Sequence, residues 1–571
     1  MWRKEFDRGH LGRWLTAGAF SVALVVAAGS AQAESGSEWT IYGGDYANTR
    51  YSSLDQITTE NVGTLRAVWM RSLGSSESQE ATPLVINGTM YIPTSSGPAS
   101  VFALNAKTGV VKWRYEPELP DDYKATVCCG LANRGVAYAN GRIFVGRLDA
   151  ILVALDANTG EELWSVPVQE YAKGYSLTSP PTTVKDLVIT GFSGGEFGVR
   201  GALQAYKQDT GELVWKTYTI PGAGEPGNET WLGDSWKTGG GAIWYVGSYD
   251  AELNLIYYGT SNAAPWGGQT RGHDSSDIGE YTNKHTASQL AFDVDTGKIV
   301  WSYQMTPSDV WDYDGVNEGI LVDLKIGNST VPTLLKADRN GFFYVMNRKS
   351  GELVSARHYV LTNWASHVDK GSGMPVEDEA YRPQLDKWAR NVCPNLIGGK
   401  NWQPMSYSQQ TGLIYMPTFN MCMDIANRDQ EFVEGTFFLA SEFDLAVAGP
   451  GDNLGEFVAY DPITGEKVWG IKEELPFLGG AMTTAGGLVF YGNPAGDLKA
   501  VDARSGEILW NFPVGTGITA SPVTYLADGK QYIAVVAGRL VGPPSFFGEI
   551  GQRVIDASPT GGVVVAFELP N

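Results

Sequence analysis

The stretch Val101-Phe-Ala-Leu-Asn-Ala-Lys-Thr-Gly109, followed by Trp113, decides the fold because its pattern recurs along the chain. It returns as Leu152-Val-Ala-Leu-Asp-Ala-Asn-Thr-Gly160 with Trp164. Further copies, each with Trp four residues after the glycine, are Gly211 with Trp215, Gly297 with Trp301, Gly465 with Trp469 and Gly506 with Trp510. A degenerate copy at Gly351 has Ser355 in the Trp position. Apolar alternation around a turn glycine predicts a β-hairpin in each copy, with Trp as a wedge between neighbouring units.

Repeated hairpins must pack against each other to bury both faces, and radial packing gives a propeller. One repeat is divided between the two ends of the chain. Its second strand is Leu65-Arg-Ala-Val-Trp69, and its first strand is Val563-Val-Val-Ala-Phe567, so pairing the two would close the ring. We therefore predict an all-β fold, an eight-bladed β-propeller of four-stranded blades forming one domain over residues 34–571. Two long intervals between repeats, about 222–285 and 365–450, are predicted to hold insertions that form functional loops.

The N-terminus has the pattern of a secretory signal peptide. Basic residues at 3, 4, 8 and 13 precede an apolar stretch from Leu15 to Ala28 and the small-residue pattern Ala31-Gln32-Ala33. Residues 1–33 are therefore predicted to be removed, and the mature chain to be periplasmic or secreted, without a membrane span. The full chain carries a net charge of −21, and removing the leader's +2 leaves −23. Such a charge disfavours nucleic acid and anionic membranes and favours cations or a basic partner protein.

Two of the four cysteines, Cys128 and Cys129, are adjacent. Exported proteins normally use cysteines to join distant segments, which neighbouring residues cannot do. Their disulfide would instead present a rigid, polarisable surface to a nearby site, and the alternative is a pair of buried free thiols.

Oxygen ligands are the other candidates for chemistry. In Trp311-Asp-Tyr-Asp-Gly315, an extended backbone would place Asp312 and Asp314 on one face, where they would repel without a cation between them. The alternative is a solvated loop. Glu196 and Asn262 could add ligands from other blades, although either alone is typical of a turn. The five histidines show no metal spacing, and no Cys-x-x-Cys-His haem motif, serine-nucleophile motif or Walker loop is present.

Taken together, these motifs resemble the PQQ (pyrroloquinoline quinone)-dependent, or quinoprotein, alcohol dehydrogenases, in particular their lanthanide-dependent methanol and ethanol dehydrogenase type. The resemblance runs from Trp39 to the C-terminus. Its motifs are Cys128-Cys129 with Asn133-Arg-Gly135, Gly195-Glu-Phe-Gly-Val-Arg-Gly201, Gly239-Gly-Gly-Ala-Ile-Trp244, Trp311-Asp-Tyr-Asp-Gly-Val-Asn317, Ala337-Asp-Arg-Asn-Gly-Phe-Phe-Tyr344 and Gly399-Lys-Asn-Trp402.

The resemblance implies a site. The quinone would lie between a Cys128–Cys129 disulfide and Trp244, and Cys393 with Cys422 would form a second disulfide. Residues around the cofactor edge would be Glu80, Arg134, Thr178, Ser193, Gly194, Gly195, Arg339 and Asn420. The metal ligands would be Glu196, Asn262, Asp312 and Asp314. Two departures are Leu478, where a Trp is usual near the quinone, and Ser308, where a His is usual.

The implied function is oxidation of a primary alcohol to the aldehyde by hydride transfer to metal-bound PQQ, with a soluble cytochrome c as electron acceptor. Asp312 would be the base, and Arg339 would stabilise the developing oxyanion. A third carboxylate, Asp314, favours a trivalent lanthanide over Ca²⁺. The alternatives are a calcium enzyme in which Asp314 is a surface residue, a quinoprotein for bulkier alcohols, and a non-catalytic propeller scaffold. The family often forms dimers, so a homodimer is a further possibility.

Overall fold

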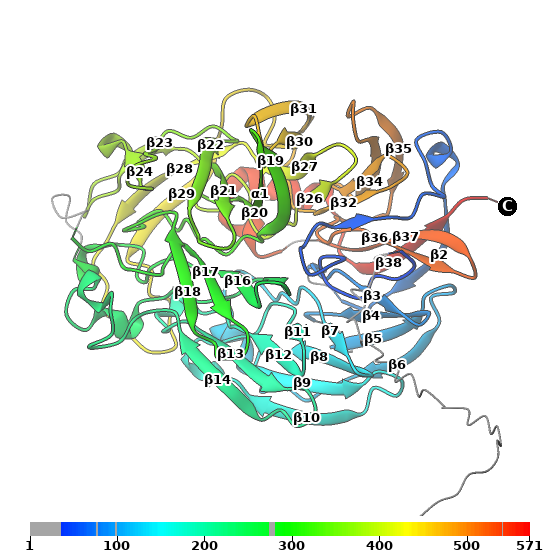
Figure 1. The fold of residues 1–571 in the computed structure, drawn as a ribbon, viewed down its shortest axis with the longest axis horizontal. Coiled ribbons are helices and arrows are strands. Elements are labelled where there is room, and N and C mark those ends of the chain that lie inside the picture. The colour runs from blue at the N-terminus through cyan, green and yellow to red at the C-terminus, as the bar shows by residue number, and fades with distance from the viewer. Residues whose placement is uncertain (1–35, 76–77, 97–99, 273–279, 540, 571) are drawn as a thin grey trace, which may run out of the picture. The chain divides into compact units, whose positions relative to one another are not determined.

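The computed structural model describes residues 36–75, 78–96, 100–272, 280–539 and 541–570 (Figure 1). The predicted signal peptide, residues 1–33, lies outside the described residues. Within the described part, no helix has the length and apolar character needed to cross a bilayer.

Eight antiparallel sheets of the repeat type are formed by the described residues, and each follows one copy of the hairpin pattern. Their strands are β3 (Leu84–Ile86), β4 (Thr89–Pro93), β5 (Val101–Asn105) and β6 (Val111–Tyr115); β7 (Ala137–Ala139), β8 (Arg142–Gly146), β9 (Ile151–Asp156) and β10 (Glu162–Pro167); β11 (Thr182–Val184), β12 (Leu187–Thr190), β13 (Ala202–Lys207) and β14 (Leu213–Tyr218); β15 (Ser248–Asp250), β16 (Leu255–Gly259), β17 (Ser288–Asp293) and β18 (Ile299–Gln304); β19 (Ile320–Ile326), β20 (Ser329–Ala337), β21 (Phe342–Asn347) and β22 (Leu353–His358); β26 (Ser406–Ser408), β27 (Leu413–Phe419), β30 (Gly455–Asp461) and β31 (Glu466–Glu473); β32 (Ala481–Thr484), β33 (Leu488–Gly492), β34 (Asp497–Asp502) and β35 (Ile508–Pro513); and β2 (Arg66–Ser72), β36 (Val523–Ala527), β37 (Lys530–Gly538) and β38 (Gly562–Glu568). The short strand β1 (Tyr51–Ser52) adds to β32 in parallel. The prediction of a mostly β fold built from four-stranded sheets is confirmed.

The remaining elements are two smaller sheets and short helices. The sheets pair β23 (Ala365–Val368) with β24 (Pro375–Glu377), and β25 (Ala389–Val392) with β28 (Met421–Asn427) and β29 (Ser441–Ala448). The helix α1 spans Gly548–Ala557, and the 3₁₀ turns are η1 (Val62–Thr64), η2 (Tyr123–Thr126), η3 (Tyr171–Lys173), η4 (Gly195–Phe197), η5 (Asn228–Thr230), η6 (Ser235–Thr238), η7 (Gln269–Arg271), η8 (Glu379–Tyr381) and η9 (Pro543–Phe546).

The repeated tryptophans join neighbouring sheets, as predicted. In each copy the indole N–H donates to a carbonyl at the edge of the next sheet, over 2.9–3.2 Å, in the pairs Trp69–Ala106, Trp113–Ala157, Trp164–Gln208, Trp215–Val294, Trp301–Arg348, Trp469–Ala503 and Trp510–Leu65. The turn glycine makes room for the ring: a Cβ at Gly160, whose φ is +76°, would lie 2.5 Å from the Trp113 ring.

The degenerate copy lacks such a link. Ser355 occupies the Trp position in β22, and the Arg357 side chain lies against the turn glycine Gly465 of the next sheet. Phe343 and Tyr460 pack across the same boundary with ring centroids 4.8 Å apart. An arginine stem and an aromatic pair therefore fill the space that tryptophan fills elsewhere.

The last sheet combines the two ends of the described chain. β2 pairs antiparallel with β38, in register from Arg66 opposite Glu568 to Ser72 opposite Val563. This is the pairing predicted from the sequence. Because Trp510 donates to Leu65 beside β2, the contacts between sheets form a closed cycle (Figure 1).

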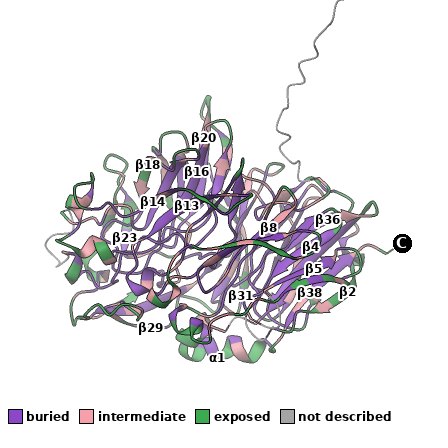
Figure 2. Ribbon diagram, turned by 90° about the horizontal axis from the view of Figure 1, so that it is seen from below, coloured by how far each residue is buried: buried purple, intermediate pink, exposed green. Residues whose placement is uncertain are grey.

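The insertions differ from the predicted ranges. Residues 222–285 also contain β15 and β16, and residues 365–450 also contain β26 and β27, which belong to regular sheets. The helix α1 was not predicted; its Ile550 and Val554 are buried while its other face is exposed (Figure 2). This helix packs on β29.

Replacing one wedge tryptophan should lower the stability of the protein more than replacing an exposed residue in the corresponding strand of another sheet. Trp215 is 9% exposed, and we expect Trp215→Ala to lower the free energy of unfolding by about 3–5 kcal/mol, measured by urea denaturation. Val300, 54% exposed, is the control, and Val300→Ala should stay within about 0.5 kcal/mol of the parent. Equal effects would contradict the wedge role.

Candidate active site

A cavity of about 230 Å³ brings together predicted site residues from distant parts of the chain. The predicted residues on its wall are Glu80, Cys128, Cys129, Arg134, Thr178, Ser193, Gly194, Glu196, Trp244, Asp312 and Arg339. Four others, Gly195, Asn262, Asp314 and Asn420, are not on the wall. The loops between strands of successive sheets supply most of these side chains, as expected where a ring of sheets positions its connecting segments.

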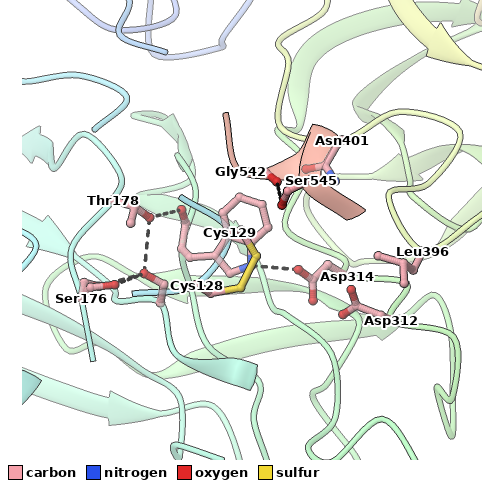
Figure 3. The surroundings of a disulfide bond; sticks show 12 residues. Cys128, Cys129, Ser176, Thr178, Asp312, Asp314, Leu396, Asn401, Gly542 and Ser545 are labelled. Atoms are coloured by element: carbon pink, nitrogen blue, oxygen red, sulfur yellow. Dashed lines mark hydrogen bonds between the residues drawn. A yellow bond between two sulfur atoms is a disulfide. The ribbon is translucent and has the colours of Figure 1, made fainter. Parts of the chain in front are cut away.

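Cys128 and Cys129 form a disulfide on this wall, so the alternative of two free thiols is wrong. Figure 3 draws the disulfide with Asp312, Asp314 and Thr178 among its surroundings. Cys393 and Cys422 form the second disulfide implied by the resemblance, and no cysteine is left free. The adjacent pair is thus a local surface rather than a link between distant segments.

Two buried guanidinium groups flank the indole of Trp244. The Cζ atom of Arg134 lies 5.1 Å from a ring centroid of Trp244 and 4.9 Å from that of Trp402, and Arg134 pairs with Glu80 at 2.9 Å. The Cζ of Arg339 lies 5.4 Å from the Trp244 ring. A disulfide, an indole and two cations on one cavity wall fit a flat, anionic aromatic cofactor.

Three carboxylates lie together beside this wall. Ligand oxygens of Glu196, Asp312 and Asp314 are all within 4.8 Å of one another. Asp314 is fully buried and Asp312 nearly so, so both a solvated loop and a surface position for Asp314 are wrong. The expected extended backbone is also wrong, because Asp312 has φ +64°. The left-handed turn, and not strand alternation, brings the two carboxylates together.

The protein itself provides hydrogen-bond and ion-pair partners for some of the oxygen atoms of this cluster. Asp314 Oδ2 accepts the indole N–H of Trp244 at 2.8 Å and lies 3.1 Å from Arg339 Nη2, while Asp314 Oδ1 accepts the Asn262 backbone N–H. Arg339 Nη1 lies 3.3 Å from Asp312 Oδ2. Among the described residues, the buried Asn262 Oδ1 and Asp312 Oδ1 have no hydrogen-bond partner. Oxygen atoms left free beside a carboxylate cluster fit a hard cation.

The pKa shifts of the three carboxylates also favour a bound cation. Burial, together with Asp314, raises the pKa of Glu196 to about 7 and raises the pKa of Asp312 well above its usual range. Burial also raises the pKa of Asp314, although Arg339 opposes this change. One arginine does not balance the two buried carboxylates of Asp312 and Asp314 and the partly buried one of Glu196, so a bound cation would stabilise their ionised forms.

Asp309 holds the turn that carries these ligands. Its buried carboxylate accepts the backbone N–H of Trp311 and of Tyr313, both at 3.0 Å, on either side of Asp312. Asp309→Asn would replace one acceptor with a donor, and we expect it to weaken cation binding about 10- to 100-fold, measured by titration of the metal-free protein. Arg348 pairs with the exposed Asp323, so Asp323→Asn is the control and should leave the affinity unchanged. Unchanged affinity in Asp309→Asn would contradict this role.

The remaining predicted residues have other surroundings. Asn420 donates to the carbonyls of Pro450 and Asn453, so its assignment to the cofactor edge stays a prediction. Gly195 lies behind the wall, where a Cβ would be 2.7 Å from Asn262 Oδ1. Leu478 lines the cavity, and Ser308 donates to the Tyr281 carbonyl.

Several wall residues were missed as site residues. Trp402 was noted only as part of a motif, and Trp266 was not identified at all. The apolar residues Leu396, Ile397, Phe437, Leu439, Phe443 and Leu445 come from the second predicted insertion, and its length and aromatic content were the signals available. Phe546 precedes α1, which the sequence analysis did not predict.

The fold and the cavity together are typical of a β-propeller enzyme that binds a cofactor. The family described as "PQQ: Glucose/ethanol/alcohol dehydrogenase, beta-propeller domain" matches residues 39–356 and 452–533. The chain belongs to the PQQ-dependent alcohol dehydrogenase family and is a quinoprotein alcohol dehydrogenase.

Three relatives show how close this relationship is. The lanthanide-dependent methanol dehydrogenase of Methylacidiphilum fumariolicum (strain SolV) is 43% identical over 525 residues, 88% of this chain and 84% of that protein. The quinoprotein alcohol dehydrogenase PedH of Pseudomonas putida is 41% identical over 91% of this chain and 89% of that protein. The structure of a europium-containing methanol dehydrogenase matches with a TM-score of 0.88 at 40% identity, covering 93% of this chain and 98% of that one.

Proposed function

We propose that this protein is a periplasmic enzyme that oxidises a primary alcohol to the aldehyde with PQQ and a lanthanide ion. In this proposal residues 34–571 form one eight-bladed propeller domain after removal of the signal peptide. The observation that carries the proposal is the cluster of Glu196, Asp312 and Asp314 beside a cavity walled by the Cys128–Cys129 disulfide and Trp244.

The residues that would hold the cofactor follow from the wall. The disulfide and Trp244 would contact the two faces of the quinone, and Arg134 and Arg339 would pair with its carboxylates. The other edge contacts would come from Glu80, Thr178, Ser193 and Gly194, with Gly195 and Asn420 as predicted contacts that the cavity wall does not support. When bound, PQQ supplies the electrophilic carbon that takes up hydride from the alcohol.

The chain itself provides the base. Asp312 Oδ1 is buried in the cavity wall without a hydrogen-bond partner among the described residues, so it is free to accept the hydroxyl proton of an alcohol. Arg339 contacts both Asp312 and Asp314; together with the bound cation it would favour the ionised form of Asp312, and it would stabilise negative charge on the substrate oxygen. The Glu196, Asn262, Asp312 and Asp314 oxygens would bind the cation.

Three carboxylates match a trivalent ion better than a divalent one. Two relatives, a lanthanide-dependent and a europium-containing methanol dehydrogenase, support this choice. The two electrons taken from the alcohol would pass to a soluble cytochrome c. The acidic mature chain would attract a basic surface on that partner, and this attraction should weaken as salt is added.

The first test is reconstitution of the mature chain, purified without metal, with PQQ and either La³⁺ or Ca²⁺. Alcohol-dependent reduction of an artificial dye is expected with La³⁺ and should be much slower with Ca²⁺, because each of the three carboxylates interacts more strongly with a trivalent ion than with a divalent one. Turnover with Ca²⁺ alone would refute the lanthanide assignment. No PQQ uptake with either ion would favour the non-catalytic scaffold.

A further inference from the structure

Two rows of aromatic side chains line the cavity, and each row leads from a buried ring to an exposed one. The first begins at Phe197, directly after Glu196, and continues to Phe437. Their rings stack with centroids 4.8 Å apart and an interplanar angle of 25°. Phe197 is buried, whereas Phe437 is 44% exposed, so this row leads outward.

The second row begins on another loop. Trp266, four residues after Asn262, packs on Phe443 with ring centroids 5.7 Å apart, and Phe443 packs on Phe546 at 6.5 Å. Trp266 is buried, Phe443 is partly buried and Phe546 is 44% exposed. All five aromatic residues of the two rows line the same cavity.

Aliphatic side chains line the same cavity as the aromatic rows and the proposed base. Leu396 is fixed there because its carbonyl accepts Arg339 Nη1 at 3.2 Å, the same nitrogen that contacts Asp312. Figure 3 draws Leu396 and Asp312 together in the surroundings of the disulfide. Ile397, Leu439 and Leu445 also line the cavity. A molecule whose hydroxyl reaches Asp312 would therefore have its other end among hydrocarbon and aromatic groups.

We infer that this passage makes the enzyme selective for apolar primary alcohols, longer-chain or aromatic, over methanol. The inference rests on the proposed function, since it names the substrate class of that same site. Each methylene group of the alcohol that moves from water into the passage should raise the binding affinity about fourfold, so the preference over methanol should grow with chain length. Methanol has no group to place between the rows, and a polyol would lose hydrogen bonds to water that these side chains cannot replace.

Kinetics on a homologous series tests the inference. With PQQ and metal bound, kcat/KM is expected to rise about fourfold per methylene from methanol through 1-hexanol. Phe437→Ala and Phe546→Ala should each lower kcat/KM for 1-hexanol about five- to tenfold while changing that for methanol less than twofold. The control is Phe432→Ala: Phe432 is similarly exposed, at 41%, and packs on Phe438, but is not a lining residue.

A binding measurement separates this inference from the proposed function. Saturation-transfer NMR on the full chain without an electron acceptor should show 1-hexanol bound in preference to methanol, with the signal reduced by Phe437→Ala but not by Phe432→Ala. This result would support the apolar passage even if no alcohol were oxidised. A kcat/KM for methanol equal to that for 1-hexanol, or equal effects of the Phe437 and Phe432 substitutions, would overturn it.

Discussion

Asp312→Asn is expected to lower kcat by about 10²- to 10⁴-fold, the usual contribution of a general base. The amide keeps the size of the side chain and an oxygen that can accept from Arg339, 3.3 Å away, but it cannot take up a proton. Dye reduction under saturating alcohol is the measurement. Because Asp312 is also a proposed metal ligand, PQQ and metal content must be determined on the same sample.

The control for Asp312→Asn is Asp323→Asn, which removes a carboxylate from an exposed ion pair with Arg348 and should leave kcat unchanged. A variant at position 312 that retains PQQ, metal and normal turnover would show that another group removes the proton. Loss of metal together with loss of turnover would instead place Asp312 among the metal ligands.

Asp314→Ala should reduce lanthanide affinity on the order of a hundredfold and Ca²⁺ affinity less, because the third carboxylate interacts more strongly with a trivalent ion. Trp244 donates to Asp314 at 2.8 Å, so its indole would lie close to the ion and sensitise Tb³⁺ luminescence. Titration of metal-free protein with Tb³⁺, and competition with La³⁺ or Ca²⁺, gives both affinities directly.

Asp314→Asn is the matched variant for this experiment. It keeps the volume and an acceptor for the Trp244 N–H while removing the charge, so a loss similar to that of Asp314→Ala assigns the effect to charge. Equal lanthanide affinity in both variants and in the parent would refute a ligand role. Asp314 would then serve to neutralise Arg339, which lies 3.1 Å away.

The repeats were sufficient to predict the sheets because each hairpin is encoded locally, by apolar alternation, a turn glycine and a tryptophan. The pairing of the first and last strands followed from the same pattern. The borders of the insertions did not follow, since β15 and β26 are only three residues long and carry no repeat signature. The helix α1 lies outside the hairpin pattern altogether.

The site was predicted largely by resemblance, and the structure shows where local reasoning failed. The proximity of Asp312 and Asp314 was expected from an extended segment, yet it arises from a left-handed residue held by Asp309. Phe546 was missed because tertiary packing, not a motif, brings it to the cavity. The residues proposed to carry out the reaction were therefore easier to predict from motifs than the residues of the cavity wall.

The pairing of β2 with β38 has a mechanical consequence. The two strands run antiparallel, so Arg66, where β2 begins, lies opposite Glu568, where β38 ends. A pull between Arg66 and Glu568 would therefore open this pair first and then each following pair in turn. The segment before β2 is itself paired, at Trp39 with Val85 and at β1 with β32, and these contacts would have to break before a pull on the N-terminal side reached the seam.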